Sequence, residues 1–201
     1  GCVEAMVELV LGAKVIVPAR SPYNSPIFCV FKRDGSLRFV QDFRTLNMHS
    51  LDDKFSIMDV RECLVMVGKL KPKIFSSVAL SGAYWRLSLS PDSRPYTAFT
   101  IPHLNAQYMW TRAAMGLKGC PSSFSRYMGH IFRDFRGTCV TYIDDGLFLS
   151  QDHHSHLRLL DEAASVLRAE NLKLNVKKCC FGRRELTFLG FNISASGISP
   201  C

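Results

Sequence analysis

The sequence predicts an α+β fold built on an antiparallel sheet. Stretches that favour strands are mixed with stretches that favour helices, hairpin signals join several neighbouring strands, and no βαβ unit repeats along the chain. Parallel sheets need such crossover units, so a doubly wound sheet is disfavoured. With 201 residues, of which 47% are hydrophobic, the chain is long enough for one large domain or two small subdomains.

The first elements follow from apolar spacing and turn residues. Apolar residues recur at helical spacing between Val3 and Val10, and Gly12 then predicts the end of a short helix. The pair Asp34-Gly35 separates two strand-like runs and predicts a hairpin. Farther on, MDVRECLVMVGKL predicts a helix ending at Gly68, and KIFSSVAL predicts a buried strand directly after it.

The middle of the chain predicts a hairpin and then the clearest helix. The hairpin is expected from Arg86 to Ile101, with Pro91 and Asp92 at its turn. From Gly119 onward, six apolar residues share one helical face and Pro121 suits the first turn. These six residues are Phe124, Tyr127, Met128, Ile131, Phe132 and Phe135.

Two adjacent carboxylates, Asp144 and Asp145, stand out in the last third. They lie between TCVTY and GLFLS, which predict a hairpin. Neighbouring like charges repel, and Asp is a poor strand former, so the pair costs stability unless a cation or solvent offsets it. Turn chemistry alone also explains Asp at a hairpin tip. Asp152 is then expected to cap a helix, and ELTFLGFNIS predicts a closing strand.

Charge and cysteine usage narrow the partners. Lys and Arg exceed Asp and Glu by eight, which favours polyanions such as nucleic acid or anionic lipid. The eight cysteines include no C-x-x-C pair, so we expect buried free thiols. We also expect an intracellular location, in the cytoplasm or nucleus. Charged residues interrupt the apolar N-terminal segment, so we expect no membrane span.

Other sites have less support. His153 and His156 are three residues apart, a spacing that places two side chains on one helical face. The segment is nevertheless expected to be the exposed start of a helix rather than a metal site. No nucleophile-elbow pattern supports a hydrolase.

Six blocks in order carry a family resemblance: KRDGSLRFVQDFRTLN, PYTAFTIP, MGLKGCPSSF, YIDD, LKLNVKKCCF and ELTFLGF. Together they resemble the reverse transcriptases, most closely those of Gypsy-type LTR retrotransposons, with retroviruses as cousins. The resemblance runs from about Leu9 to Ile198 and implies fingers and palm, the palm having a ferredoxin-like antiparallel sheet with flanking helices. Within residues 1–201 it implies fingers mainly in 1–74, and palm mainly in 75–201 with a fingers insertion near 86–112. Thumb and RNase H regions are expected beyond Cys201.

The resemblance implies nucleotidyl transfer to a primer 3′-hydroxyl by two Mg²⁺ ions. It assigns Asp144 and Asp145 as metal ligands, because hard cations prefer oxygen donors. In the strand FSSVALSGAYW, the family has a third metal-binding Asp where this chain has Ala79. The rest of the strand keeps the family frame, at Phe75, Ser76, Val78, Leu80 and Tyr84. Mg²⁺ binding is therefore expected to be weak or absent.

The resemblance also implies roles for residues around this site. It assigns Lys32 and Arg38 to the incoming triphosphate, Tyr84 and Met115 to the nucleotide pocket, and Phe188, Leu189 and Gly190 to the primer grip. It gives Asp42 and Arg44 architectural and template-facing roles, and it places Lys177 and Lys178 on a lysine-bearing turn near the active centre.

Two functions remain open at this point. One is a catalytically impaired domain of retroelement origin, retained for binding an RNA or DNA template-primer or a protein partner. The other is an RNA-directed DNA polymerase module in which Ala79 is an engineered or compensated change. The sequence leaves the oligomeric state open.

Overall fold

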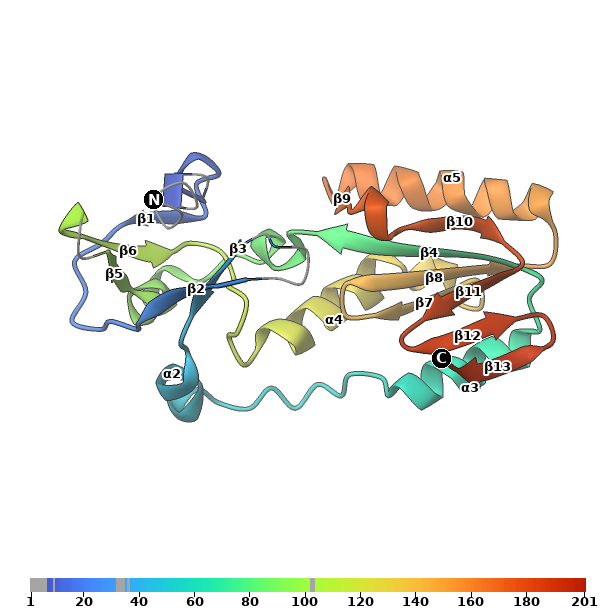
Figure 1. Cartoon of the computed structure of the whole chain (residues 1–201), viewed down its shortest axis with the longest axis horizontal. Helices are drawn as coiled ribbons and strands as arrows, with labels where there is room; N and C mark the ends of the chain where they lie inside the picture. The colour runs from blue at the N-terminus through green and yellow to red at the C-terminus, as the bar shows by residue number, and fades with distance from the viewer. Residues whose placement is uncertain (1–6, 9, 32–34, 36, 102–103) are drawn as a thin grey trace. The chain divides into compact units, whose positions relative to one another are not determined.

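The computed structural model describes residues 7–8, 10–31, 35, 37–101 and 104–201 (Figure 1). The chain divides into two compact units. The first unit comprises residues 1–53 and 84–120, and the second comprises residues 54–83 and 121–201. The chain thus leaves the first unit, enters the second, and returns to each once.

The first unit is built from short strands and short helices. Its strands form two antiparallel sheets, one in the order β1-β6-β5 and one made of β2 and β3. Its core gathers nine buried residues around Phe99 and Trp110. The elements are β1 (Ile16–Pro18), β2 (Ile27–Phe31), β3 (Leu37–Gln41), α2 (Arg44–His49), η2 (Pro91–Thr97), β5 (Phe99–Ile101) and β6 (Ala106–Trp110).

A buried amide fastens β3 to the other sheet of this unit. Gln41 is 5% exposed, and its Nε2 donates to the carbonyl oxygens of Thr97 and Ala98. Its Oε1 accepts from the indole Nε1 of Trp110 at 2.7 Å. Every polar atom of the amide therefore has a partner, which makes its burial tolerable.

The predicted hairpin from Arg86 to Ile101 is wrong. The chain forms two 3₁₀ helices there, η1 (Ala83–Arg86) and η2, and only β5 is a strand, paired with β6. Proline explains the difference. Pro91 occupies the first turn of η2 and Pro95 lies within it, and neither can donate a hydrogen bond to a strand ladder.

The second unit contains the longest helices and the largest sheet. Its elements are α3 (Val60–Leu70), β4 (Ile74–Ser81), α4 (Cys120–Ile131), η4 (Arg133–Phe135), β7 (Cys139–Tyr142), β8 (Asp145–Ser150), α5 (His153–Ala169), β9 (Lys173–Leu174), η5 (Val176–Lys178), β10 (Cys180–Arg183), β11 (Glu185–Phe188), β12 (Phe191–Ser194) and β13 (Gly197–Pro200). The helix α4 begins at Cys120, the last residue assigned to the first unit.

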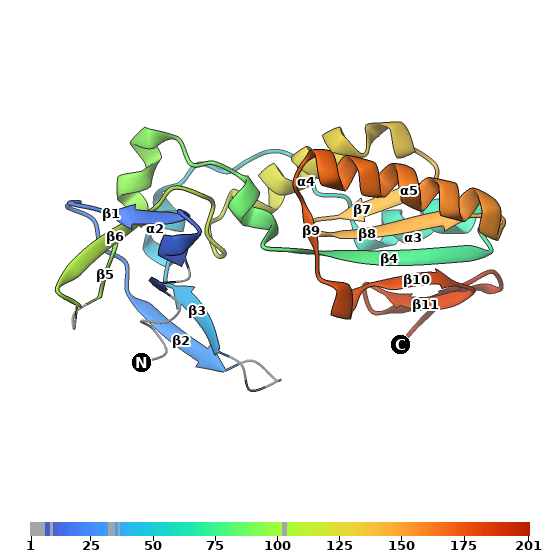
Figure 2. The ribbon, with the colours of Figure 1, turned by 90° about the horizontal axis from the view of Figure 1, so that it is seen from above.

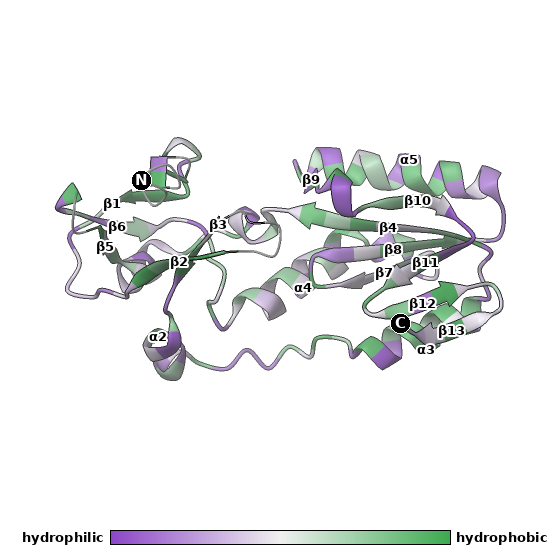
Figure 3. Ribbon diagram, in the orientation of Figure 1, coloured by the Kyte–Doolittle hydropathy of each residue, from purple (hydrophilic) through white to green (hydrophobic). Residues whose placement is uncertain are grey.

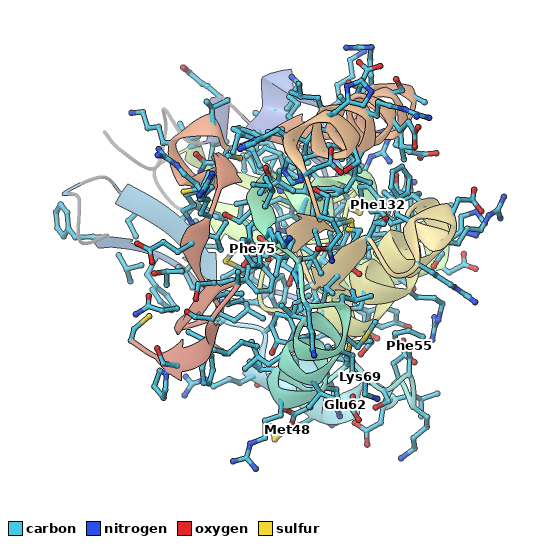
Figure 4. The ribbon with its side chains drawn as sticks, turned by 90° about the vertical axis from the view of Figure 1, so that its right-hand side faces the viewer. Met48, Phe55, Glu62, Lys69, Phe75 and Phe132 are labelled. Atoms are coloured by element: carbon cyan, nitrogen blue, oxygen red, sulfur yellow. The ribbon has the colours of Figure 1, made fainter. Side chains whose placement is uncertain are left out.

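An antiparallel sheet in the order β10-β4-β8-β7 forms the middle of this unit, and β9 also pairs with β4. The helix α5 runs along this sheet (Figure 2). On the opposite face, α3 and the small sheet β11-β12-β13 enclose a core that includes Phe75, Leu147 and Phe188. Phe75, labelled in Figure 4, is fully buried.

The predicted helices of the second unit are present, but α4 ends at Ile131, so Phe132 and Phe135 of its expected face lie beyond it. Asp59 and Glu62 form a capping box at the start of α3, which runs two residues past the predicted end at Gly68. Asp152 caps α5 through the amide of Ser155. Hydrophilic and hydrophobic residues alternate along α5 (Figure 3), as one buried face requires. The predicted α+β class with antiparallel sheets is likewise confirmed.

Candidate active site

The two adjacent carboxylates lie where β7 turns into β8, Asp144 on the turn and Asp145 as the first residue of β8. Tyr142 pairs with Asp145, so Ile143 and Asp144 alone form the turn. Ile143 has a φ of 53°, in the left-handed region that β-branched residues avoid. Such a conformation costs roughly 1–3 kcal/mol and persists only where its surroundings enforce it. The turn that carries the acids is therefore a strained one.

Ala79 lies directly opposite Asp145 on the neighbouring strand. The pairing of β4 with β8 joins these two residues, and the amide of Leu80 donates to the carbonyl oxygen of Asp144 at 3.0 Å. Paired residues of an antiparallel sheet point to the same face. Tyr142, Asp145 and Ala79 therefore form one row across three strands, with a methyl group at the end of the row.

A third segment, which leads from β9 into η5, also lies beside Ala79. The amide of Asn175 donates to the carbonyl oxygen of Ala79 at 2.8 Å, and η5 follows immediately. The predicted lysine turn, Lys177 and Lys178, thus begins beside Ala79. Ala79 itself is 8% exposed, because β8 and this segment flank it on both sides.

Electrostatics at the turn oppose ionisation of Asp145. Burial raises the pKa of this carboxyl, the negative charge of Asp144 raises it further, and the ammonium group of Lys178 partly lowers it. Both carboxylates are half-buried. Lys178 offsets only part of these effects, so the ionised pair costs the fold stability when no metal cation lies beside it.

The predicted site residues fall into both units. Ala79, Asp144, Asp145 and Lys178 belong to the second unit, where the sheet brings them together. Tyr84, which is half-buried, and Met115, which is 60% exposed, belong to the first unit. Arg38 lies on β3, also in the first unit, and Lys32 lies outside the described residues.

The predicted primer grip forms a tight hairpin in the second unit. Phe188 pairs with Phe191, leaving Leu189 and Gly190 as the turn, with φ values of 51° and 82°. Two positive φ values in succession define a type I′ turn, which matches the twist of the flanking strands. Phe188 is buried in the core under the main sheet, so the hairpin is held firmly at its base.

In the first unit, Asp42 and Arg44 form an exposed forked ion pair. The Nε of Arg44 donates to both carboxylate oxygens of Asp42, and its Nη2 donates to Oδ2 at 2.6 Å. These hydrogen bonds lower the pKa of Asp42 to about 2 and raise that of Arg44. The pair fixes the start of α2 and leaves the rest of the guanidinium exposed.

His156 is buried, contrary to the expectation from the sequence. It was expected on an exposed helix start, yet it is 2% exposed and hydrogen-bonds to the hydroxyls of Ser76 and Ser150. Ser76 also accepts from the amide of Gly182 at 2.9 Å, so the network joins α5, β4, β8 and β10. The signal was present, because His156 continues the buried stripe of Leu159, Ala163 and Leu167.

Within the described ranges, no three or more His, Cys, Asp or Glu residues gather as metal ligands would. No helix in that part of the chain is both long and apolar enough to cross a bilayer. The free thiols among the described cysteines include Cys63, Cys120, Cys139, Cys179, Cys180 and Cys201. Cys63 and Cys120 are buried as expected, but Cys180 and Cys201 are exposed, so the expectation of buried thiols is wrong for these two.

Comparison with known proteins identifies the family. A sequence model of "Reverse transcriptase (RNA-dependent DNA polymerase)" matches residues 30–193, so this chain belongs to the reverse transcriptase family. The enzymatic polyprotein of cauliflower mosaic virus (strain CM-1841) is 33% identical over 98% of this chain and 29% of its own length. The retrovirus-related Pol polyprotein from the Drosophila melanogaster transposon opus is also 33% identical, over 98% of this chain and 20% of its own length.

Solved structures agree with this assignment. The foamy viral protease-reverse transcriptase in complex with dsDNA superposes with a TM-score of 0.89 at 26% identity, over 100% of this chain and 41% of that one. The same foamy viral protein in complex with an RNA/DNA hybrid gives a TM-score of 0.85 at 27% identity, over 99% and 26% of the two chains. This chain therefore spans less than half the length of each of these relatives.

Proposed function

We propose that this chain is a reverse transcriptase module of Gypsy-type retroelement origin that is impaired in nucleotidyl transfer and binds nucleic acid or a protein inside the cell. Residues 1–74 would be mainly fingers, and residues 75–201 would be mainly palm with a fingers insertion near residues 86–112. The observation that carries the proposal is the placement of Ala79, a residue without a ligand atom, directly opposite Asp145.

The chemistry of the donor set supports impairment. The family uses Mg²⁺, and a hard cation needs oxygen ligands. Asp144 and Asp145 supply carboxylates, but the Ala79 methyl group supplies nothing where the family has a carboxylate shared by both ions. The residues present therefore do not fit a two-ion site. Loss of several kcal/mol of transition-state stabilisation is expected, or roughly a thousandfold in rate.

Charge supports binding to nucleic acid. The chain carries a formal net charge of +8. Exposed basic residues follow the candidate site in sequence, namely Lys177, Lys178, Arg183 and Arg184. Structural relatives have been solved with dsDNA and with an RNA/DNA hybrid. A template-primer is therefore the first ligand to test.

The remaining roles are part of the same proposal. Lys32 and Arg38 would hold a triphosphate, Tyr84 and Met115 would line the nucleotide pocket, and Phe188, Leu189 and Gly190 would hold the primer end. Asp42 and Arg44 would face the template.

A second candidate is an RNA-directed DNA polymerase module in which Ala79 is engineered or compensated. One observation favours it: the strained turn at Ile143 still presents Asp144 and Asp145, with the ammonium charge of Lys178 nearby. Strained backbone is costly and is often kept for function.

Primer extension separates the two candidates. The chain is incubated with a DNA primer on an RNA template, deoxynucleotides and Mg²⁺, beside Ala79→Asp and Asp144→Ala variants. We expect no extension by the chain as it stands and a gain of extension in Ala79→Asp. Extension by the unmodified chain that disappears in Asp144→Ala would instead establish the polymerase candidate.

A further inference from the structure

Two tyrosines meet on the surface of the first unit. Tyr23, on the loop between β1 and β2, and Tyr96, on η2, have ring centroids 4.6 Å apart with planes tilted by 49°. Tyr23 is 47% exposed and Tyr96 is 44% exposed. Each tyrosine therefore leaves close to half of its surface to solvent.

Hydrogen bonds fix the first half of the loop that carries Tyr23. The side-chain amide of Gln107 accepts from the amide of Ser21 at 2.7 Å and donates to the carbonyl oxygens of Ser21 and Tyr23. The hydroxyl of Ser21 donates to the carbonyl oxygen of Pro95, next to Tyr96, at 2.7 Å. The tyrosine pair is thus preorganised, so binding to it would cost little conformational entropy.

The other end of the loop is held just as firmly. The amide of Ser25 donates to the carbonyl oxygen of Ala98 at 2.8 Å, and Thr100 donates to the side chain of Asn24 at 2.7 Å. The carbonyl oxygen of Pro26 accepts from the amide of Asp42 at 2.9 Å. The tyrosine loop therefore joins the segment that carries Asp42 and Arg44.

An arginine precedes each of the two tyrosines in the sequence. Arg20 is exposed and lies three residues before Tyr23. Arg94 lies two residues before Tyr96, and its Nε donates to the carbonyl oxygen of Leu89, which fixes the guanidinium group. Asp92 is the one acid on η2. The excess of basic over acidic residues here favours an anionic partner. The two exposed rings favour a partner that also offers flat apolar faces.

We propose that Tyr23 and Tyr96 form a stacking platform for unpaired bases of single-stranded nucleic acid, with Arg20 and Arg94 near the phosphates. Aromatic side chains stack on any base, and fixed cations beside them attract the backbone. This role rests on the proposed nucleic-acid binding. It adds a second binding surface, whose residues are distant in sequence from Asp144 and Asp145. A template strand not yet paired is the ligand that this chemistry suits.

Anisotropy of labelled oligonucleotides tests the platform. Binding of an oligothymidylate and of a blunt duplex is measured at low salt for the chain and for Tyr23→Ala, Tyr96→Ala and Tyr23→Phe variants. Leu157→Ala, at an exposed apolar residue of α5, is the matched control. Stacking of one base is worth about 1–3 kcal/mol, or about 5- to 150-fold in affinity. The alanine variants should lose at least about fivefold on oligothymidylate, while Tyr23→Phe and Leu157→Ala should stay within about twofold.

The duplex separates the platform from the proposed function. Its bases are paired and stacked, so both alanine variants should bind it as the unmodified chain does. Unchanged oligothymidylate affinity in both alanine variants overturns the platform, including the case in which the tyrosines serve a protein surface. If the unmodified chain binds the duplex but not oligothymidylate, the platform alone is wrong. If it binds neither, nucleic-acid binding itself is wrong.

Discussion

At the scale of single residues, His156 makes the stability of the fold depend on pH. Its imidazole is buried between the hydroxyls of Ser76 and Ser150, and burial, together with His153, lowers its pKa from the usual 6.5. A base whose folded-state pKa is lowered binds fewer protons in the folded state than in the unfolded state. Stability is then fully present above pH about 6.5 and falls as the pH drops below that value toward the folded-state pKa.

Urea unfolding at a series of pH values checks this. The free energy of unfolding should decrease below pH about 6.5 in the unmodified chain, and His156→Gln should remove part of that decrease. His156→Gln should also cost about 1–3 kcal/mol at pH 8, because two buried hydroxyls lose a well-placed partner. His130→Gln, at an exposed position of α4, is the control. Identical pH profiles for all three proteins would contradict the role given to His156.

Ionised Asp145 is expected to lower stability at neutral pH, whereas His156 is expected to lower it at acidic pH. Its pKa is raised, chiefly by burial and then by Asp144, so ionisation of the carboxyl lowers stability as the pH rises through the folded-state pKa. Without divalent cations, Asp145→Asn should therefore be stabilised by about 0.5–1 kcal/mol, the scale of like-charge relief on a sheet. Thermal unfolding measures the change, with the exposed Asp134→Asn as control. Destabilisation by Asp145→Asn would mean that the carboxylate has a stabilising partner.

At the scale of elements, alanine substitutions at two glycines are expected to have opposite effects on stability, one through close packing of strands and the other through helix propensity. A Cβ at Gly146 on β8 would lie 3.1 Å from Cγ2 of Val78 on β4, whereas a Cβ at Gly129 in α4 meets nothing within 4 Å. Gly146→Ala should destabilise the fold by about 1 kcal/mol or more, since β4 and β8 must separate slightly. Gly129→Ala should stabilise it by about 0.5–1 kcal/mol, because alanine is the better helix former. Equal urea midpoints for the two variants would refute the close contact.

Sequence patterns predicted the elements with strong local signals. The capped helices α3 and α5, the buried strand β4 and the hairpin around Asp144 all follow from periodicity and turn residues. The predicted hairpin from Arg86 to Ile101 was wrong, because two prolines turn η2 into a 3₁₀ helix.

Long-range placement could not be predicted in the same way. Adjacent acids were visible in the sequence, but the register that places Ala79 opposite Asp145 is a property of the folded sheet. The buried role of Gln41 depends on Thr97, 56 residues away, and that of His156 depends in part on Ser76, 80 residues away. Polar residues of this kind look exposed until their partners are known.

At the scale of the whole molecule, the net charge of +8 predicts salt-dependent binding to duplexes. The logarithm of the association constant should fall linearly with the logarithm of the salt concentration, since each neutralised phosphate releases counterions. Filter binding of a blunt duplex over a salt series measures the slope. Replacing Lys177 and Lys178 together with Gln should make the slope shallower. A slope near zero would exclude phosphate contacts as the basis of binding.

The proposed impairment depends on Ala79 occupying the position where a divalent-cation site would have its third carboxylate ligand. Calorimetric titration of Mg²⁺ into the unmodified chain, Ala79→Asp and Ala79→Asn tests it most directly. Asn has nearly the volume of Asp but no charge, so it separates the ligand from the added bulk. We expect saturable Mg²⁺ binding in Ala79→Asp alone, because only that variant places a third carboxylate in the row with Asp145. Saturable binding by the unmodified chain, equal to that of Ala79→Asp, would contradict this role of Ala79.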